Sequence, residues 1–467
     1  MRDMNAAEIA AAVNGELRIA SGEALYNKNL INSICTDTRE LAPGCLFIPI
    51  IGEKYDGHDF INQALDAGAV GCFYSCPPEK LNHFREDKFY IRVPDTKIAL
   101  GQLAGAYRQK FKIPFVQITG SVGKTTTKEL IASVLSAKLN ILKTQKNYNN
   151  EIGAALTLLN LNYQHQAAVI ETGMNHAGEI LKLAEMTRPD IAVITNIGDA
   201  HMEYFGSREG ILKAKSEIFE YLNPNGLAIL NGDDKLLNTL NLPFRVTRCG
   251  YSANCQVKIK DFTDYGIRGI SCVIQTERDE YEIRLKSPGA YLAWTAAIGV
   301  AVGEELNLNH DEIVKGAANY KPTGSRMRVW YLDDGRILLD DCYNASPQSV
   351  TAALEVLSKT ECDKRIAVLG DMGELGGLAD SAHYNIGALT AMLGIDDVVA
   401  IGKRAAGIAQ GAVDSGGDAS HFHAIQDALP DLIRRFEPGA AMLVKASHAM
   451  EFYMIVDSMK DAFGPAI

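Results

Sequence analysis

Residues 118–129 read Ile-Thr-Gly-Ser-Val-Gly-Lys-Thr-Thr-Thr-Lys-Glu. An apolar run, Phe115–Thr119, precedes this stretch, and a helical pattern, Leu130–Leu139, follows it. A glycine-rich turn between a strand and a helix lets backbone N–H groups converge on phosphate oxygens, and the helix N-terminus adds a partial positive charge. Ile118 departs from the usual Gly-x4-Gly-Lys-[Ser/Thr] pattern, because it stands at the place of the first glycine. We predict a phosphate-binding loop; a glycine turn of purely structural use is the alternative.

The residues of this loop are the candidate contacts to a nucleotide. Lys124 would reach the β- and γ-phosphates, and Thr125 or Thr126 would offer its hydroxyl to Mg²⁺. The loop residues expected to contact ATP are Gly120, Ser121, Val122, Gly123, Lys124, Thr125 and Thr126.

Short apolar runs separated by helical patterns continue along the chain. Such runs are typical of a parallel sheet covered on both faces by helices, which predicts an α/β fold. The expected strands are Ala168–Glu171, Ile191–Thr195, Leu227–Leu230, Ile337–Asp340, Ile366–Leu369, Val398–Ile401 and Met442–Val444.

The chain has 467 residues, more than one hydrophobic core usually serves, so several domains are expected. Residues 1–95 have short strands and turns and predict a small N-terminal α/β domain. Residues 96–322 predict the central domain with the parallel sheet, and residues 323–467 repeat the strand–helix pattern. The breakers in 322–325 (Pro-Thr-Gly-Ser) suggest a hinge.

Composition excludes several function classes. The formal net charge is −11, which argues against a chain-wide grip on nucleic acid. No apolar run reaches the roughly 20 residues that span a bilayer, so we expect no membrane insertion. The nine cysteines are scattered without a Cys-x-x-Cys pair, which predicts reduced thiols and a cytoplasmic location.

Three residues downstream of the loop are candidate active-site groups. Glu171 ends an apolar strand, where a carboxylate can face the ligand crevice of an α/β sheet and bind Mg²⁺; a solvated strand end is the alternative. His201 follows the next strand, where a lone histidine is more often a hydrogen-bonded turn residue. Lys215 lies on a helical pattern, where a solvated lysine is the default expectation.

With these residues in view, the chain resembles the Mur ligase family. The loop 119–129 is similar to that family's ATP loop, and further similar blocks follow in order along nearly the whole chain. These blocks are residues 37–39, 47–60, 147–153, 171–180, 195–201, 340–347 and 369–376. Within the family, the tail of the loop and the block at 369–376 favour the members that use D-alanyl-D-alanine.

The resemblance implies three domains: an N-terminal UDP-binding domain, a central P-loop ATPase domain and a C-terminal dinucleotide-fold-like ligase domain. It implies an ADP-forming ligase that joins D-alanyl-D-alanine to UDP-N-acetylmuramoyl-tripeptide through an acyl phosphate, the last cytoplasmic step of the peptidoglycan precursor pathway. ATP and Mg²⁺ are the implied cofactors, and a monomer is the implied state. A sister ligase with another amine substrate, a folylpolyglutamate-type ligase and a non-catalytic nucleotide-binding protein are the alternatives.

The resemblance also implies residue roles. Lys124, Glu171, His201 and Lys215 would be catalytic, with Lys215 carbamylated. Metal contacts would come from Thr125, Glu171, His201 and Lys215. Arg326 and Asp341 would meet the nucleotide from the third domain. The implied substrate contacts are Asp37, Thr38, Arg39, Asn149, Asn150, Tyr343 and Asn344.

Two segments depart from the family. Its histidine and asparagine near the adenine are Tyr291 and Thr295 here, and an arginine near the C-terminus is His448. We therefore carry over no adenine contact from 289–295.

Overall fold

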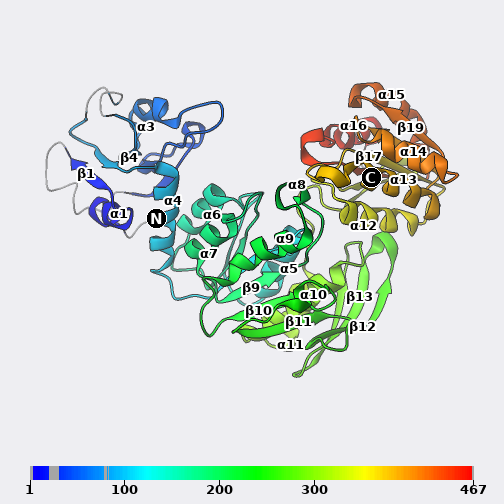
Figure 1. Cartoon of the computed structure of the whole chain (residues 1–467), viewed down its shortest axis with the longest axis horizontal. Helices are drawn as coiled ribbons and strands as arrows, with labels where there is room; N and C mark the ends of the chain where they lie inside the picture. The colour runs from blue at the N-terminus through cyan, green and yellow to red at the C-terminus, as the bar shows by residue number, and fades with distance from the viewer. Residues whose placement is uncertain (1–3, 20–30, 78–80, 82–83, 465–467) are drawn as a thin grey trace.

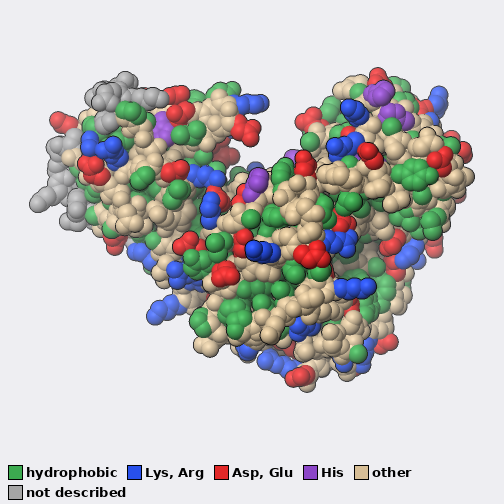
Figure 2. Space-filling model, in the orientation of Figure 1, with side chains coloured by type: hydrophobic (Ala, Val, Ile, Leu, Met, Phe, Trp, Pro, Cys, Tyr) green, Lys and Arg blue, Asp and Glu red, His purple; other side chains and the backbone are tan. Residues whose placement is uncertain are grey.

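The computed structural model describes residues 4–19, 31–77, 81 and 84–464. Within these residues the chain forms three β-sheets in succession, which confirms the predicted three-domain α/β class. In Figure 1 the N-terminal sheet lies at upper left and the C-terminal sheet at upper right, above the central sheet. The space-filling view shows an open notch between the two upper lobes (Figure 2). The domain boundaries at 95/96 and 322/323 stay predictions.

The N-terminal region is built on a small, mostly parallel sheet of strand order β1-β5-β4-β3-β2, in which β1 pairs antiparallel with β5. Its strands are β1 (Glu16–Ile19), β2 (Ser33–Cys35), β3 (Cys45–Phe47), β4 (Gly71–Tyr74) and β5 (Phe89–Arg92). Its helices are α1 (Ala6–Ala12), the 3₁₀ turns η1 (Thr38–Glu40) and η2 (Gly57–Phe60), and α3 (Ile61–Asp66).

The central region has a sheet of order β14-β13-β12-β11-β10-β9-β6-β8-β7, parallel from β7 to β12 and antiparallel beyond. The strands are β6 (Phe115–Thr119), β7 (Ile141–Lys143), β8 (Ala167–Glu171), β9 (Ile191–Ile194), β10 (Leu227–Asn231), β11 (Arg245–Gly250), β12 (Val257–Asp264), β13 (Ile270–Gln275) and β14 (Glu280–Leu285). The helices are α4 (Thr96–Arg108), α5 (Lys124–Leu135), α6 (Glu151–Leu159), α7 (Glu179–Thr187), α8 (Met202–Phe205), α9 (Arg208–Ser216), α10 (Leu292–Glu305) and α11 (His310–Ala318), with 3₁₀ turns η4 (Glu217–Phe219), η5 (Leu237–Thr239) and η6 (Gly266–Arg268).

Both faces of the parallel strands are buried, as their unbroken apolar runs predict. On β8, Ala168 and Ile170 join the core under α4, α6, α7 and α9, whereas Val169 joins the core under α5, α10 and α11. The antiparallel strand β14 instead alternates exposed and buried residues, so one of its faces meets solvent.

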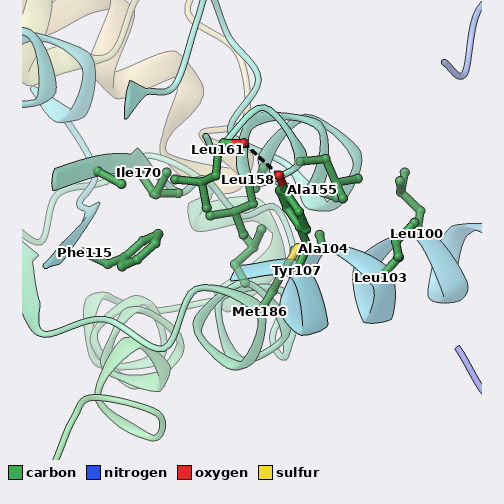
Figure 3. Close-up of a cluster of buried hydrophobic side chains, with 14 of the residues drawn as sticks. Leu100, Leu103, Ala104, Tyr107, Phe115, Ala155, Leu158, Leu161, Ile170 and Met186 are labelled. Carbon is green, nitrogen blue, oxygen red and sulfur yellow. Dashed lines mark hydrogen bonds between the residues drawn. The ribbon is translucent and has the colours of Figure 1, made fainter. Parts of the chain in front are cut away.

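The first of these cores continues into the N-terminal region through α4. Figure 3 shows Leu100, Leu103 and Tyr107 of α4 packed among side chains of α6, α7 and β8. The Tyr107 hydroxyl donates to the Leu161 carbonyl oxygen at 3.0 Å. The same core includes Ile9 of α1, so α4 joins the N-terminal and central regions.

The C-terminal region repeats the doubly wound pattern, with strand order β15-β16-β20-β17-β18-β19 and only β15 antiparallel. Its strands are β15 (Arg328–Tyr331), β16 (Ile337–Asp340), β17 (Lys364–Gly370), β18 (Asp397–Ile401), β19 (Ala419–Phe422) and β20 (Ala440–Lys445). Its helices are α12 (Pro347–Ser358), α13 (Ala379–Met392), α14 (Ala406–Asp414), α15 (Ile425–Arg435) and α16 (Tyr453–Phe463), with 3₁₀ turns η7 (Asp333–Gly335), η8 (Gly376–Leu378) and η9 (His448–Met450). Two apolar clusters line the two faces of this sheet.

Two further expectations concern the whole chain. No disulfide joins the nine cysteines, all of which lie in the described residues, and every one except Cys362 is buried. Among the helices of the described residues, none is both long and apolar enough to cross a bilayer.

Candidate active site

The loop between β6 and α5 is shaped by its glycines and by the strand beside it. A Cβ added to Gly120 would lie 1.9 Å from Thr195 Oγ1, so only glycine fits there. Gly123 has φ 85°, in the left-handed region that glycine adopts without strain. Asn196 holds the loop: its carbonyl oxygen accepts from Ser121 N at 3.1 Å, and its Oδ1 accepts from Val122 N at 3.0 Å. The loop conformation is therefore determined before any ligand arrives.

Helix α5 starts at Lys124, directly after this loop. The first N–H groups of a helix have no acceptor within it, and Gly123 has no side chain to cap them. These N–H donors and the positive end of the helix dipole can therefore bind an anion at the loop. The sequence predicts that this anion is a phosphate.

The Lys124 ammonium folds back over the loop. Its Nζ donates to the carbonyl oxygen of Gly120 at 2.7 Å and lies 3.4 Å from that of Ser121. Burial lowers the pKa of Lys124, while the nearby Glu171 carboxylate acts in the opposite direction. Carbonyl oxygens carry only partial charge, so a phosphate bound at this loop would be a stronger partner for this cation.

Glu171 is buried, not solvated, at the end of β8. Its side chain is 1% exposed, and its Oε1 accepts from Thr125 Oγ1 at 2.9 Å and from Asn149 Nδ2 at 3.0 Å. Its Oε2 has no hydrogen-bond donor among the described residues. The tertiary structure thus brings together three predicted site residues from three separate segments.

This pair of oxygen donors fits a magnesium ion. Mg²⁺ prefers hard oxygen ligands and binds through one or two protein groups with water and phosphate completing its shell. The hydroxyl of Thr125 and the carboxylate of Glu171 are adjacent, and the carboxylate has an unused oxygen. Among the described residues no group of three or more His, Cys, Asp and Glu forms a metal site.

Lys215 is also buried, contrary to the default expectation of a solvated lysine. It lies in the last turn of α9, a helix that Ser207 caps by accepting a hydrogen bond from Gly210 N, and its exposed fraction is 1%. Burial, and then the charge of Lys124, hold the pKa of Lys215 well below its ordinary value. The side chain therefore favours the neutral, nucleophilic amine.

His201 meets a carboxylate from the C-terminal region. Its Nδ1 lies 2.6 Å from Glu374 Oε2, and both residues have positive φ, 67° and 61°. Left-handed backbone is costly for such residues and persists only where the surrounding structure holds it. The backbone Glu203 N also donates to the Glu374 carbonyl oxygen at 3.3 Å. Sequence reasoning assigned no role to Glu374.

The other predicted C-terminal residues form a cluster facing this site. The Arg326 guanidinium stacks over the Tyr343 ring at 3.8 Å, and its charge acts on Lys124 of the loop. Asp341 Oδ1 accepts from Met327 N at 2.9 Å, and Asp341 Oδ2 pairs with the buried Lys445 at 2.5 Å. Arg326 and the loop lysine are thus within electrostatic reach across the two regions.

Tyr291 also faces this C-terminal cluster. Burial, followed by the charge of Asp341, raises its pKa well above the ordinary value, so the ring stays a neutral phenol. The tyrosine that replaces the family's histidine therefore lies beside the residues expected to hold the nucleotide.

Several predicted substrate residues have local structural roles. Asp37 caps η1 and pairs with the exposed Arg39, whose hydrogen bond lowers the pKa of Asp37 to about 2. Asn150 caps α6 by accepting from Gly153 N at 2.8 Å. The side chain of Asn344 accepts from the next residue's N–H. These contacts are compatible with a substrate role for Asp37, Thr38, Arg39, Asn150 and Asn344 and do not themselves indicate one.

Lys128 is a buried cation that the sequence analysis did not assign. Its side chain is 1% exposed, and its Nζ lies 3.6 Å from Glu171 Oε2. The sequence did hold one sign of this position. Lys128 follows Thr125 by three residues on α5, and residues three apart lie on the same face of a helix.

Comparison with known proteins places the chain in a family. Models of the Mur ligase family match residues 30–108 (catalytic domain), 118–303 (middle domain) and 325–448 (glutamate ligase domain). UDP-N-acetylmuramoyl-tripeptide--D-alanyl-D-alanine ligase of Bacillus subtilis is 36% identical over 93% of this chain and 94% of its own length. The enzyme of the same name in Escherichia coli is 37% identical over 86% of this chain and 88% of its own length.

Solved structures agree over nearly the full length. MurF from Acinetobacter baumannii superposes with a TM-score of 0.88 at 30% identity, covering 98% of both chains. MurF ligase from Thermotoga maritima, solved in complex with ADP, superposes with a TM-score of 0.82 at 26% identity, covering 93% of this chain and 98% of that one. From these matches, the chain belongs to the Mur ligase family.

Proposed function

We propose that this chain is a UDP-N-acetylmuramoyl-tripeptide--D-alanyl-D-alanine ligase that splits ATP to ADP and phosphate. The proposal is supported by relatives of that name at 36% and 37% identity over most of the chain. A MurF structure solved in complex with ADP supports nucleotide binding by this fold. The observation that carries the proposal is the loop 119–127, with its free helix N-terminus, beside the buried Glu171–Thr125 pair.

The reaction must bring two anions together. The carboxylate of the tripeptide attacks the γ-phosphorus of ATP, the bond from that phosphorus to the bridging oxygen breaks, and ADP leaves. The amine of D-alanyl-D-alanine then attacks the acyl-phosphate carbonyl, and phosphate leaves as the amide forms. Repulsion between carboxylate and phosphate is the main electrostatic obstacle, so cations at the site are needed.

The site has residues that could supply or bind such cations. Lys124 would exchange its carbonyl partners for β- and γ-phosphate oxygens, and the α5 N–H groups would hold the phosphates. Thr125 and Glu171 would hold Mg²⁺, with His201 near the substrate carboxylate. Bound Mg²⁺ would neutralise phosphate charge. Arg326 and Asp341 would meet the nucleotide from the C-terminal domain, so closure of the domains would exclude water from the acyl phosphate.

Lys215 is proposed to act as a carbamate. A neutral amine adds to CO₂ through its nitrogen and loses a proton, which converts a buried potential cation into a carboxylate-like anion. The lowered pKa of Lys215 favours the reactive amine. An unmodified ammonium at this place would repel a metal, whereas a carbamate would orient it.

The remaining proposals concern substrates and setting. Asp37, Thr38, Arg39, Asn149, Asn150, Tyr343 and Asn344 are proposed to contact the UDP-sugar peptide or the dipeptide. We propose a cytoplasmic monomer, in keeping with the relatives' nucleotide-linked substrate.

The test is phosphate release with ATP, Mg²⁺, UDP-N-acetylmuramoyl-tripeptide and D-alanyl-D-alanine, omitting each component in turn. We expect full release only with all four, and a product whose mass equals tripeptide plus dipeptide minus water. Supplying the dipeptide precursor with diaminopimelate or lysine, and a folate with glutamate, separates the sister ligases. Release at the full rate without any amine would contradict the proposal.

A further inference from the structure

We propose that Lys128 is a positioning residue that acts as a resident counter-ion for Glu171 and competes with Mg²⁺ for that carboxylate. The inference rests on the proposed function, because it takes Glu171 as a magnesium ligand. Its consequence is that the metal binds well only together with nucleotide phosphates.

The first observation is a row of alternating charges beside the loop, which is buried except at its Lys143 end. Lys143 Nζ contacts Glu129 Oε2, and Glu129 Oε1 lies 3.1 Å from Lys128 Nζ. Lys128 Nζ in turn lies 3.6 Å from Glu171 Oε2. The side chains of Lys128 and Glu171 are each 1% exposed, and that of Glu129 is 9% exposed. Charges this deep must be compensated by neighbours, because water cannot do it.

The second observation is how Lys128 is held. Its Nζ donates to the Thr144 carbonyl oxygen at 2.8 Å, and Thr144 Oγ1 accepts from the Glu171 backbone N at 3.0 Å. Thr144 thus fixes the ammonium and the backbone of Glu171 relative to one another. The Lys128 side chain is therefore held in one position within the site, unlike a lysine side chain that extends into solvent.

The third observation is that the two carboxylate oxygens of Glu171 have different partners. Oε1 of Glu171 receives hydrogen bonds from Thr125 and Asn149, whereas Oε2 receives none and has Lys128 at ion-pair distance only. The positive charge stabilises the carboxylate without occupying the lone pairs of Oε2. Glu171 therefore remains free to bind a metal, but a fixed cation already lies beside it.

Coulomb repulsion between this ammonium and an incoming divalent ion must weaken metal binding. A triphosphate brings enough negative charge to overcome that repulsion, whereas free Mg²⁺ does not. Removing the ammonium should therefore strengthen binding of the metal alone and leave the metal-free protein with an uncompensated buried carboxylate.

The experiment measures Mg²⁺ binding without nucleotide, by calorimetry and by the shift of the thermal unfolding midpoint on adding Mg²⁺. For Lys128→Met we expect metal affinity on the order of tenfold higher than wild type, and a larger Mg²⁺-induced midpoint shift. Lys143→Met is the matched control: it removes a cation from the far end of the same row, and its affinity should stay within about twofold of wild type.

Two further variants keep the test decisive. Lys128→Met/Glu129→Gln removes one charge of each sign, so it folds more readily and should show the same gain. Lys128→Met/Glu171→Gln should lose the gain, because the lysine acts through Glu171. Unchanged affinity in both Lys128→Met and its Glu129→Gln combination would overturn the inference, and so would a gain that survives Glu171→Gln. Binding of Mg²⁺ and ADP together to the wild type, measured in parallel, tests the proposed function separately.

Discussion

His201 Nδ1 lies 2.6 Å from Glu374 Oε2, and this contact joins the central region to the C-terminal region. Each residue sits at a left-handed backbone position at the tip of its own segment. A second link between the two regions, Lys359 Nζ to Asp264 Oδ2 at 2.8 Å, lies elsewhere on the interface. The contact at His201 is thus a polar link between the two regions at a residue that is itself proposed to be catalytic.

Replacing Glu374 by Gln should weaken this interface in a pH-dependent way. The close contact with His201 is the main cause that lowers the pKa of Glu374 from its ordinary 4.5. A carboxyl group with a lowered pKa in the folded state contributes stability above its unfolded pKa and loses it as the pH falls through its folded pKa. Urea unfolding should show an advantage of wild type over the variant at pH 7, of about 1 kcal/mol or less because the side chain is 43% exposed.

That advantage should persist down to about pH 4.5 and shrink only below it, following the direction of the shift. Lys359→Met, which removes the Asp264 link, is the control for the loss of a contact between the two regions, and it should leave the acid-range dependence that Glu374 contributes in place. An advantage that is constant across the acid range would contradict this assignment.

Lys124→Met should nearly abolish turnover and weaken nucleotide binding. The lysine is the cation folded over the phosphate loop, and loss of one preorganised charge contact at a developing anion costs roughly 10²–10³ in rate. Calorimetry with ADP and Mg²⁺ gives binding, and phosphate release gives turnover. Lys138→Met, at an exposed lysine just beyond the same helix, should leave both unchanged. Normal ADP affinity in Lys124→Met would refute the loop as the nucleotide site.

Lys215→Ala should lose turnover and regain part of it with added short-chain carboxylic acids that replace the carbamate. The reason is the burial and lowered pKa of Lys215, which favour an amine that reacts with CO₂. Carbon-13 NMR of wild type in labelled bicarbonate should show one carbamate signal that Lys215→Ala lacks. Lys213→Ala, at an exposed neighbour on α9, is the matched control. Full activity of wild type in CO₂-free buffer would contradict the carbamate.

Gly120→Ala should disrupt the phosphate loop, because the new Cβ would lie 1.9 Å from Thr195 Oγ1. We expect at least a tenfold loss of ADP affinity, since the loop must move for the clash to be relieved. Gly101→Ala, on α4 with open space around its Cα, should be stabilising by about 0.5–1 kcal/mol. Unchanged ADP affinity in Gly120→Ala would show that the loop tolerates displacement.

Leu103→Ala should lower the free energy of unfolding by about 2–5 kcal/mol. Leu103 is fully buried on α4, in the core that joins the N-terminal and central regions (Figure 3). Urea titration followed by circular dichroism provides the measurement. Ile98→Ala, on the same helix but 61% exposed, should cost less than about 0.5 kcal/mol. Equal costs for the two variants would mean that α4 does not anchor this core.

Strand and helix positions could be predicted closely where periodicity is strong. Phe115–Thr119 and Ile337–Asp340 match β6 and β16 residue for residue, because buried parallel strands are continuous apolar runs. The helix after the loop was expected from Leu130 but begins at Lys124. Its first turn is polar, Lys-Thr-Thr-Thr, so apolar periodicity cannot reveal it.

The burial of charged side chains could not be predicted from the sequence. Solvation is the default expectation for Lys215 and one of two alternatives for Glu171, and both side chains are buried. Their environment is built by segments far apart in the chain, such as Asn149 beside Glu171. Local sequence carries no record of such neighbours.

The amino-acid order by itself determined the α/β class, the strand–loop–helix that can hold phosphate, and the membership of the Mur ligase family, because each depends on local periodicity or on short contiguous motifs. Only the tertiary structure decided which charges are sealed from water and which partners they meet: Lys128 beside Glu171, and His201 against Glu374. These pairings arise from long-range packing of strands and domains, and charge compensation in a buried site depends on distances in space.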